Sequence, residues 1–339
     1  MGTVRVGIIG CGGISGAHFR TYTAIPDVEI VACADVIEER ARQRAREFNV
    51  PHIFTDYRKL LRMDEIDAVS ICTPHTLHAP IAIAALNAGK HVLCEKPMAT
   101  TAKDAARMVR AARRNGKILQ IGIHTRFSAI VQQAKRLIDD GLLGRIYYGE
   151  GAIGGRRRIP GPTFTEMATA HGGVVLDIGV YVIDTLLHLL GQPIPLSVTA
   201  ITSSAIGEQP EAVVEGGWWW NPANFEVEDF GAAFVRFANG VAVIFKMAWA
   251  MHADSLGQSF LLGDKGGLKL HPLELYRDES GTMVTITFPN LPRGDTWIAQ
   301  MSAFIDAIRE NKPSPVPPEE VMMTNVIMDA IYESAAHGR

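Results

Sequence analysis

The first third of the chain alternates short apolar runs with longer segments in which apolar and charged positions recur with a helical period. Apolar runs rich in β-branched residues are typical of parallel strands buried on both faces, and the amphipathic segments between them are typical of covering helices. The sequence predicts strands at 4–9, 28–34, 68–72, 91–94 and 118–121, and helices at 37–48, 79–88 and 101–115. This order predicts an α/β domain with a doubly wound parallel sheet.

The rest of the chain is richer in predicted strands. Residues 227–237 and 241–249 flank Asn239-Gly240, a pair that favours a tight hairpin. Further strands are predicted at 259–262, 267–270 and 284–288, and helices at 174–190, 296–310 and 319–336. We therefore expect two domains, residues 1–122 and residues 123–339, with C-terminal helices that can pack back on the first.

Composition describes an ordinary globular chain. Of its 339 residues, 47% are hydrophobic and 20% are charged, and the net charge is -3. These values exclude a disordered chain and argue against electrostatic binding to nucleic acid or to an anionic membrane. The small net charge hides a split, because residues 1–122 hold 17 Lys and Arg against 12 Asp and Glu, whereas residues 123–339 hold 16 against 24. Two domains of different character are expected.

The N-terminus and the cysteines predict a cytoplasmic protein. The apolar run 4–9 is too short for a secretory signal, and the run 241–251 is far shorter than the roughly 20 residues of a membrane helix. The four cysteines lack CxxC spacing, which fits reduced, buried thiols better than disulfides or a zinc site. Each lies near the end of a different predicted strand: Cys11, Cys33, Cys72 and Cys94. No metal-ligand set is predicted.

A glycine-rich segment, residues 10–16, follows the first predicted strand and opens a helix. Its first glycine permits a tight turn, its second lets the backbone approach a pyrophosphate, and the helix N-terminus offers amide donors. Gly16 stands one position later than the strict GxGxxG pattern requires. Asp35, which alone would be a routine helix N-cap, can accept from the ribose hydroxyls of NAD and repel a 2′-phosphate. The sequence therefore favours NAD as the cofactor. NADP is the alternative, with Arg40 as the residue that would reach its 2′-phosphate. The predicted cofactor residues here are Gly10, Gly12, Gly13, Ile14, Asp35 and Arg40.

Two further segments follow the strands expected to flank the nicotinamide half of such a cofactor. Residues 72–78 follow the strand at 68–72, and residues 95–98 follow the strand at 91–94. A lysine at the carboxyl end of a central strand, before a proline that fixes the loop, is positioned rather than solvated. For His78, a plain helix cap is the alternative. We expect these residues in the cofactor site: Cys72, Thr73, Pro74, His75, His78, Glu95 and Lys96.

These segments resemble the glucose-fructose oxidoreductase / inositol dehydrogenase / rhizopine-catabolism (Gfo/Idh/MocA) family of NAD(P)-dependent oxidoreductases. The resemblance rests on the glycine-rich segment, on Thr73-Pro74 with His78, and on residues 89–97, which end in Glu-Lys-Pro. It continues at residues 122–127 and 172–184, the latter resembling the signature GGxxxDxGxHxxD. Position 181 holds tyrosine, where many members of the family have histidine. In this the chain resembles the sugar-oxidising branches of the family, which carry tyrosine at that position.

The resemblance implies a Rossmann domain followed by an α+β domain with a large, mainly antiparallel open sheet. One face of that sheet would pack on helices and the other would join copies into a homodimer or homotetramer. It also implies a dehydrogenase that moves a hydride between nicotinamide and a hydroxyl-bearing carbon of a sugar, polyol or sugar derivative. Expected substrate-binding residues are Lys96, His124, Arg126, Arg156, Asp177 and Tyr181.

The helix predicted after the glycine pair supports this placement. Asp177, Tyr181, Asp184 and His188 recur at i, i+4, i+7 and i+11 and form one polar stripe. A phenol with a pKa of about 10 is a poor base near neutrality unless an ammonium stabilises the phenolate. We hypothesise that Tyr181 accepts the proton, that Lys96 tunes it, and that Asp177 anchors a substrate hydroxyl. A structural network is the alternative for Asp184 and His188.

Other functions remain as alternatives. A dinucleotide-dependent sugar sensor predicts loss of Lys96 or of the acid/base residue, and both are present. An NAD-dependent glycosidase predicts signature residues that the sequence lacks. Two clusters have no assigned role: Arg156-Arg157-Arg158 is either an anion-binding loop at the site or solvated charge, and Trp218-Trp219-Trp220 either stacks on sugar or, as we favour, packs in a core or interface.

Overall fold

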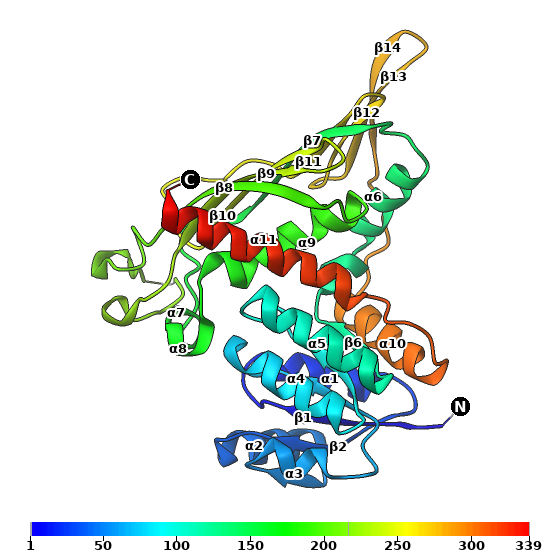
Figure 1. The fold of residues 1–339 in the computed structure, drawn as a ribbon, viewed down its shortest axis with the longest axis vertical. Coiled ribbons are helices and arrows are strands. Elements are labelled where there is room, and N and C mark those ends of the chain that lie inside the picture. Colours follow the sequence, from blue (N-terminus) through cyan, green and yellow to red (C-terminus); the bar gives the residue numbers. More distant parts are fainter. Residues whose placement is uncertain (1, 216, 339) are drawn as a thin grey trace. The chain divides into compact units, whose positions relative to one another are not determined.

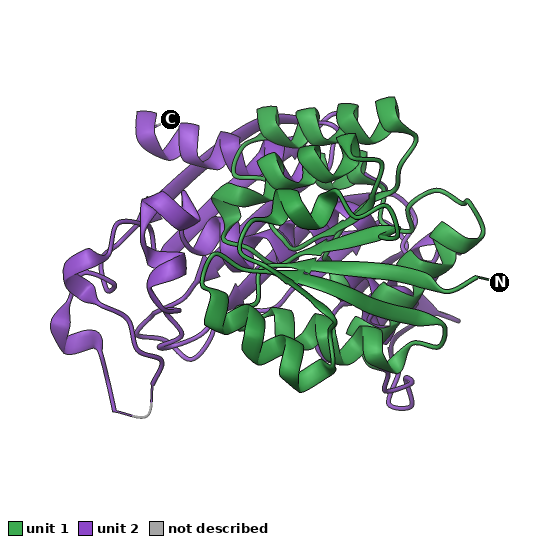
Figure 2. Cartoon of the chain, turned by 90° about the horizontal axis from the view of Figure 1, so that it is seen from below, with its two compact units in different colours: residues 1–124, 295–322 green, residues 125–294, 323–339 purple. Residues whose placement is uncertain are grey.

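The structure is a computed structural model that describes residues 2–215 and 217–338. The chain forms two compact units, residues 1–124 with 295–322 and residues 125–294 with 323–339 (Figures 1 and 2). The segment 295–322 belongs to the first unit because Met301, Phe304 and Ile305 are buried in its hydrophobic core. The long helix α11 (Pro318–His337) begins in residues of the first unit and continues in the second.

The first unit is built on a six-stranded parallel sheet in the order β3-β2-β1-β4-β5-β6, which confirms the predicted doubly wound fold. Figure 2 shows helices on both faces of this sheet. Its strands are β1 (Val4–Ile9), β2 (Val28–Ala34), β3 (His52–Phe54), β4 (Ala68–Ile71), β5 (His91–Cys94) and β6 (Leu119–Ile121). Its helices are α1 (Ser15–Ala24), α2 (Glu38–Phe48), α3 (Tyr57–Leu61), α4 (His78–Asn87), α5 (Ala102–Asn115) and α10 (Thr296–Arg309).

The second unit is built on an eight-stranded sheet in the order β14-β13-β12-β11-β7-β10-β9-β8. Only the pairing of β7 with β10 is parallel among the described strand pairs of this sheet, which confirms a large, mainly antiparallel sheet. Its strands are β7 (Ile146–Gly154), β8 (Pro195–Ser203), β9 (Phe230–Phe237), β10 (Ala242–Ala248), β11 (Phe260–Gly263), β12 (Gly266–Lys269), β13 (Glu274–Glu279) and β14 (Thr282–Thr287).

One face of this sheet is covered by a helical layer that carries the expected signature. The layer contains a π-helical turn, η3 (Val175–Gly179), which runs directly into α9 (Val180–Leu189). Glycines let it approach, since a Cβ at Gly151 would lie 2.6 Å from Val182 Cγ2 and one at Gly179 would lie 2.6 Å from Met247 Sδ. Shorter helices complete the unit: α6 (Ala129–Asp139), α7 (Pro162–Thr165) and α8 (Met167–Ala170).

The helical run Met167–Leu189 is long and apolar enough to cross a membrane by length and composition alone. However, 83% of its most apolar window is buried inside the protein. Its apolar side chains are therefore explained by packing in the core of the second unit.

Candidate active site

The glycine-rich turn at the end of β1 has two kinds of glycine. Gly10 has φ +93°, and a Cβ there would lie 2.6 Å from the Cys72 carbonyl oxygen, so the protein itself requires glycine. Around Gly12 and Gly13 no described atom lies within 4 Å of an added Cβ. These two positions border open space at the N-terminus of α1, whose first turn holds no acidic residue. The half-exposed Ile14 is the N-cap residue. The turn therefore fits a dinucleotide pyrophosphate.

Asp35 ties the end of β2 to this turn. One carboxylate oxygen accepts from the Cys11 backbone N–H at 2.8 Å and the other accepts from the Ile37 N–H at 2.8 Å. Asp35 is not the helix N-cap, because Ile37 occupies that position of α2. Each carboxylate oxygen keeps a second lone pair for a ribose hydroxyl. Arg40 is exposed in the first turn of α2.

His78 joins the two loops in which cofactor residues were predicted. Its Nδ1 lies 2.7 Å from the Pro97 carbonyl oxygen and its Nε2 lies 2.9 Å from the Thr73 carbonyl oxygen, and the side chain is fully buried. Burial lowers the pKa of His78 against the opposing effect of these hydrogen bonds. Both ring nitrogens thus lie within hydrogen-bond distance of backbone carbonyl oxygens, and a neutral ring donates to one of them. His78 joins the two loops, and its contact with a cofactor stays a prediction.

The remaining predicted residues of these loops lie at the same edge of the sheet. Cys72 is buried, and its N–H donates to the Ile9 carbonyl oxygen at 2.7 Å. Pro74 precedes a single 3-10 turn, His75–Leu77, in which His75 is buried. Thr73 Oγ1 is buried with no hydrogen-bond partner among the described residues. A buried hydroxyl in this state is suited to a ligand group.

Glu95 forms a buried pair with a residue of α1. Its carboxylate lies 2.9 Å from Nε2 of His18, which is fully buried. The cofactor contact expected for Glu95 stays a prediction. Sequence reasoning missed His18, although a histidine among the apolar residues of a core-facing helix is a signal that a buried partner exists.

His124 is the first residue of the 3-10 turn after β6. Its ring stacks on Trp297 of α10 with centroids 4.9 Å apart, and Nδ1 lies 3.0 Å from Thr296 Oγ1. Burial lowers the pKa of His124. Its substrate role remains a prediction, whereas its packing against α10 is a contact that the sequence did not reveal.

Asp177 lies in the π-helical turn of the second unit and is largely buried. Its Oδ2 accepts a hydrogen bond from the indole N–H of Trp249 at 3.0 Å. Trp249 is itself fully buried and follows β10. The π-helical turn interrupts the regular helix expected over 174–190, so the predicted i, i+4, i+7, i+11 stripe is not continuous. Turns of this kind often accompany functional residues.

Glu228, which sequence reasoning missed, holds the start of this helix. Its carboxylate accepts from the Gly173 N–H at 2.9 Å, from the Val175 N–H at 3.0 Å and from the Tyr332 hydroxyl at 2.8 Å. Burial raises the pKa of Glu228, and the hydrogen bonds oppose that rise. A Cβ at Gly173 would lie 2.0 Å from the Glu228 carbonyl oxygen, which explains the glycine.

Arg126 and Asp184 form a buried ion pair. Arg126 Nε lies 2.8 Å from Asp184 Oδ2, Nη2 lies 2.8 Å from Oδ1, and both side chains are buried. A bidentate pair of this kind commits the guanidinium to the carboxylate. The ion pair favours a structural role for Asp184, and the substrate contact expected for Arg126 stays a prediction.

The arginine cluster at 156–158 and the tryptophan cluster at 218–220 differ in their surroundings. Arg156 is exposed and lies 3.9 Å from Asp254, while Arg157 contacts the Met251 carbonyl oxygen at 3.2 Å. Trp220 is buried and donates to the Gly207 carbonyl oxygen at 2.8 Å, whereas Trp218 and Trp219 are exposed. All three tryptophans lie outside the helices and strands.

The structure thus collects the predicted residues in two places, one in each unit. Gly10, Gly12, Gly13, Asp35 and Thr73 share the carboxyl edge of the parallel sheet, and Asp177 and Tyr181 share the start of the η3–α9 helix. Within the described residues, no group of three or more His, Cys, Asp or Glu could hold a metal ion.

Comparison with known proteins shows which family has this sequence and fold. The description "Oxidoreductase family, NAD-binding Rossmann fold" matches residues 4–123, and "GFO/IDH/MocA C-terminal domain" matches residues 131–269. D-glucoside 3-dehydrogenase of Escherichia coli (strain K12) is 31% identical over 99% of this chain and 96% of its own. Inositol 2-dehydrogenase 2 of Saccharopolyspora erythraea is 32% identical over 80% and 74%.

A solved structure of levoglucosan dehydrogenase in complex with NADH and levoglucosan has a TM-score of 0.86 at 27% identity, covering 99% of this chain and 98% of that one. The similarity therefore extends through both units. This chain belongs to the GFO/IDH/MocA family of NAD-binding oxidoreductases, which includes sugar and polyol dehydrogenases acting on CH–OH groups.

Proposed function

We propose that this protein is an NAD-dependent dehydrogenase that acts on a hydroxyl-bearing carbon of a sugar, polyol or sugar derivative. The observation that carries the proposal is the glycine-rich turn, where Gly12 and Gly13 border open space beside Asp35 and the N-terminus of α1. Relatives named for glucosides, levoglucosan and inositol support a carbohydrate substrate.

The chain's own residues would supply proton transfer and orientation. When bound, the nicotinamide supplies the hydride acceptor or donor. Tyr181 takes the hydroxyl proton, and the ammonium of Lys96 stabilises the phenolate and donates to the substrate oxygen. Asp177, whose carboxylate is oriented by Trp249, accepts a hydrogen bond from a second hydroxyl.

Asp35 supports NAD over NADP in this proposal. A carboxylate suits the two ribose hydroxyls and repels a 2′-phosphate. Binding of NADH and NADPH is measured by nicotinamide fluorescence. We expect tighter NADH binding, and we expect Asp35→Ser to narrow the difference because exposed Arg40 remains available to a phosphate.

The direct experiment offers the protein and NAD a panel of glucosides, anhydrosugars and inositols and records absorbance at the reduced nicotinamide band. Tyr181→Phe should abolish turnover and leave NADH binding nearly intact. Tyr148→Phe is the matched control, since Tyr148 lies on strand β7, away from α9 in the sequence, and its hydroxyl donates to Glu150 at 2.8 Å. Turnover retained by Tyr181→Phe would contradict the proposed base, and NADH binding without turnover on any sugar would favour a sensor.

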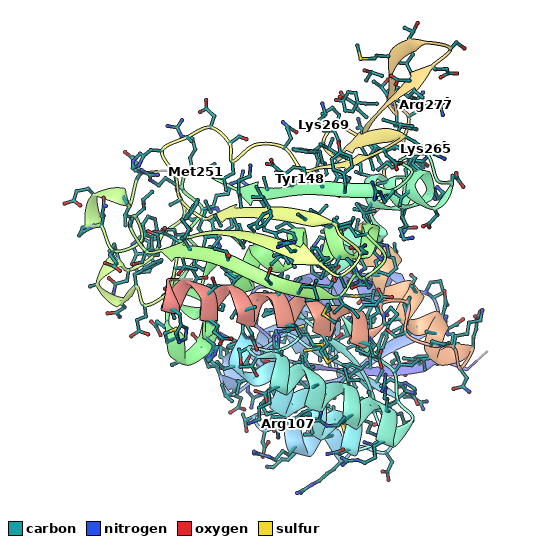
Figure 3. All side chains as sticks on the ribbon, turned by 45° about the horizontal axis from the view of Figure 1, so that its top comes forward. Arg107, Tyr148, Met251, Lys265, Lys269 and Arg277 are labelled. Atoms are coloured by element: carbon teal, nitrogen blue, oxygen red, sulfur yellow. The ribbon has the colours of Figure 1, made fainter. Side chains whose placement is uncertain are left out.

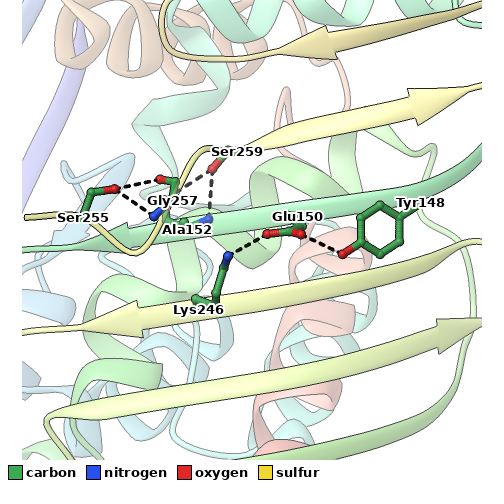
Figure 4. Close-up of polar contacts among 7 residues, drawn as sticks. All are labelled: Tyr148, Glu150, Ala152, Lys246, Ser255, Gly257 and Ser259. Carbon is green, nitrogen blue, oxygen red and sulfur yellow. Dashed lines mark hydrogen bonds and ion pairs between the residues drawn. The ribbon is translucent and has the colours of Figure 1, made fainter. Parts of the chain in front are cut away.

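The open face of the second unit's sheet supports self-association. Strand register places Ile201, Phe234 and Tyr276 on this face together with a polar row in which Lys246 pairs with Glu150 at 2.6 Å (Figure 4). Figure 3 shows Tyr148 and Lys269 on the same sheet. Adjacent Lys and Glu on an apolar face are self-complementary, so a second copy would be the partner.

Sedimentation measures this association. Ile201→Arg combined with Phe234→Arg should reduce the particle to a monomer, because charge would enter an apolar interface. Leu196→Arg, at an exposed position near α11, is the control and should leave the mass unchanged. A wild-type monomer at micromolar concentration would contradict the proposal.

A further inference from the structure

A chain of buried hydrogen bonds runs from α1 to the residue before Lys96. Glu95 Oε1 lies 2.9 Å from His18 Nε2, His18 Nδ1 lies 3.2 Å from Ser70 Oγ, and Ser70 Oγ lies 2.8 Å from the Tyr22 hydroxyl. All four side chains are buried. Because unpaired polar groups are costly in a core, this network fixes each member relative to the others.

The chain of hydrogen bonds has one orientation when Glu95 is ionised. A carboxylate only accepts, so His18 Nε2 carries the proton and donates to it. His18 Nδ1 then accepts from the Ser70 hydroxyl, which in turn accepts from Tyr22. Burial raises the pKa of Tyr22, so this phenol stays protonated as the terminal donor. This orientation holds with a neutral His18 ring, and the carboxylate of Glu95 is then the charged end of the network.

The carboxylate of Glu95 has little room to leave this position. A Cβ at Gly122 would lie 2.8 Å from Oε1, so glycine there admits the carboxylate closely. On the other side, the His18 ring meets the edge of Trp297 with centroids 5.6 Å apart. Elements α1, β4, β6 and α10 thus enclose one negative charge beside the chain position that begins the Lys96 loop.

The groups around Glu95 are mostly neutral or positive. Burial raises its pKa, but the hydrogen bond from His18 and the nearby basic side chains, Lys96 among them, outweigh burial and hold the pKa below its ordinary value. The other titratable neighbours are His124 and the thiols of Cys72 and Cys94. Burial lowers the pKa of His124, whereas burial and the nearby Glu95 raise the pKa values of the two thiols. Lys96 is the next residue along the chain.

We propose that Glu95 and His18 are positioning residues for Lys96. His18 holds the carboxylate of Glu95 in the core, and the carboxylate keeps the adjacent Lys96 side chain a charged hydrogen-bond donor toward the substrate oxygen. This inference rests on the proposed function for the role of Lys96, but the charge relation between the two residues does not depend on turnover.

The first experiment measures the charge relation directly. The ε-carbon of Lys96 is followed by NMR against pH in lysine-labelled protein without cofactor, and Lys96→Gln assigns the resonance. Glu95→Gln keeps the size of the side chain and its acceptor for His18 but removes the charge. We expect it to lower the Lys96 titration midpoint by about one pH unit. Tyr22→Phe, at the far end of the network, should leave the midpoint unchanged.

The second experiment measures turnover. Glu95→Gln and His18→Leu should each lower kcat about tenfold with NADH binding unchanged, since a buried carboxyl that loses its donor takes up a proton. His18→Gln, which restores a donor to Glu95, should recover most of the rate. An unchanged Lys96 midpoint in Glu95→Gln would overturn the inference. Absence of turnover in the wild type would instead contradict the proposed function and leave the titration as the test.

Discussion

The two units hold their candidate site residues in different ways. In the first unit the residues lie in loops at one edge of a parallel sheet, and glycines leave the backbone open there at positions 12 and 13. In the second unit they lie on a helix, and buried side chains from distant segments, Glu228 and Trp249, fix that helix and its carboxylate. The first arrangement depends on the backbone conformation of a few loop residues, whereas the second depends on satisfied buried charges.

The largest effect is expected from breaking a buried pair in the second unit. Arg126→Leu leaves Asp184 charged and unpaired, which should lower the free energy of unfolding by about 3–5 kcal/mol. Urea unfolding followed by tryptophan fluorescence reports mainly this unit, which holds four of the five tryptophans. The double variant Arg126→Leu/Asp184→Leu should recover at least half of the loss. A single-variant loss as small as that of an exposed pair would contradict the argument.

In the first unit, alanine substitutions at two glycines test the backbone conformation of the glycine-rich turn. Gly10→Ala should cost about 1–3 kcal/mol of stability from strain alone, since φ is +93° and Cys72 lies in the way. Gly12→Ala should leave stability unchanged but weaken NADH binding by about tenfold or more, because its methyl group enters the open space. Thermal unfolding and NADH fluorescence separate the two effects. Equal binding by Gly12→Ala and wild type would place the cofactor elsewhere.

The buried cap of the second unit gives a comparable effect. Glu228→Gln replaces one carboxylate oxygen by an amide –NH2 group, and both oxygens lie within 3.0 Å of the Gly173 N–H. The amide therefore meets a second donor or leaves the others unpaired, which should cost about 1–3 kcal/mol. Glu211→Gln, at an exposed position, is the control with no expected change. Chemical unfolding measures both. If the two variants behave alike, the cap does not stabilise the helix.

The last effect concerns the first unit and arises only below neutral pH. His91 accepts from the Ile118 N–H at 3.1 Å, and burial lowers the pKa of His91 to about 4. The unfolded chain binds a proton near the ordinary pKa of about 6.5, so this residue lowers stability as the pH falls from about 6.5 to about 4. His91→Asn keeps an acceptor but does not titrate. Unfolding at pH 7 and pH 4.5 should show a smaller loss for the variant, and an equal loss would contradict this account.

Much of the fold was predictable because its strands carry strong patterns. The strands at 28–34 and 91–94 agree with the structure, and helix α10 differs from its prediction by one residue. Strand β7 (Ile146–Gly154) was missed because its three glycines resemble a loop. One of them, Gly151, is required by the close approach of α9, which is a tertiary contact.

The sequence by itself determined the family, the α/β order and the glycine-rich turn, since these depend on local periodicity and short motifs. The tertiary structure decided which polar side chains face inward. Arg126 and Glu95 were expected to contact ligands, but partners far along the chain, Asp184 and His18, satisfy their charges in the interior. A buried charge must find its partner in space rather than in sequence, so spacing along the chain could not reveal these pairs.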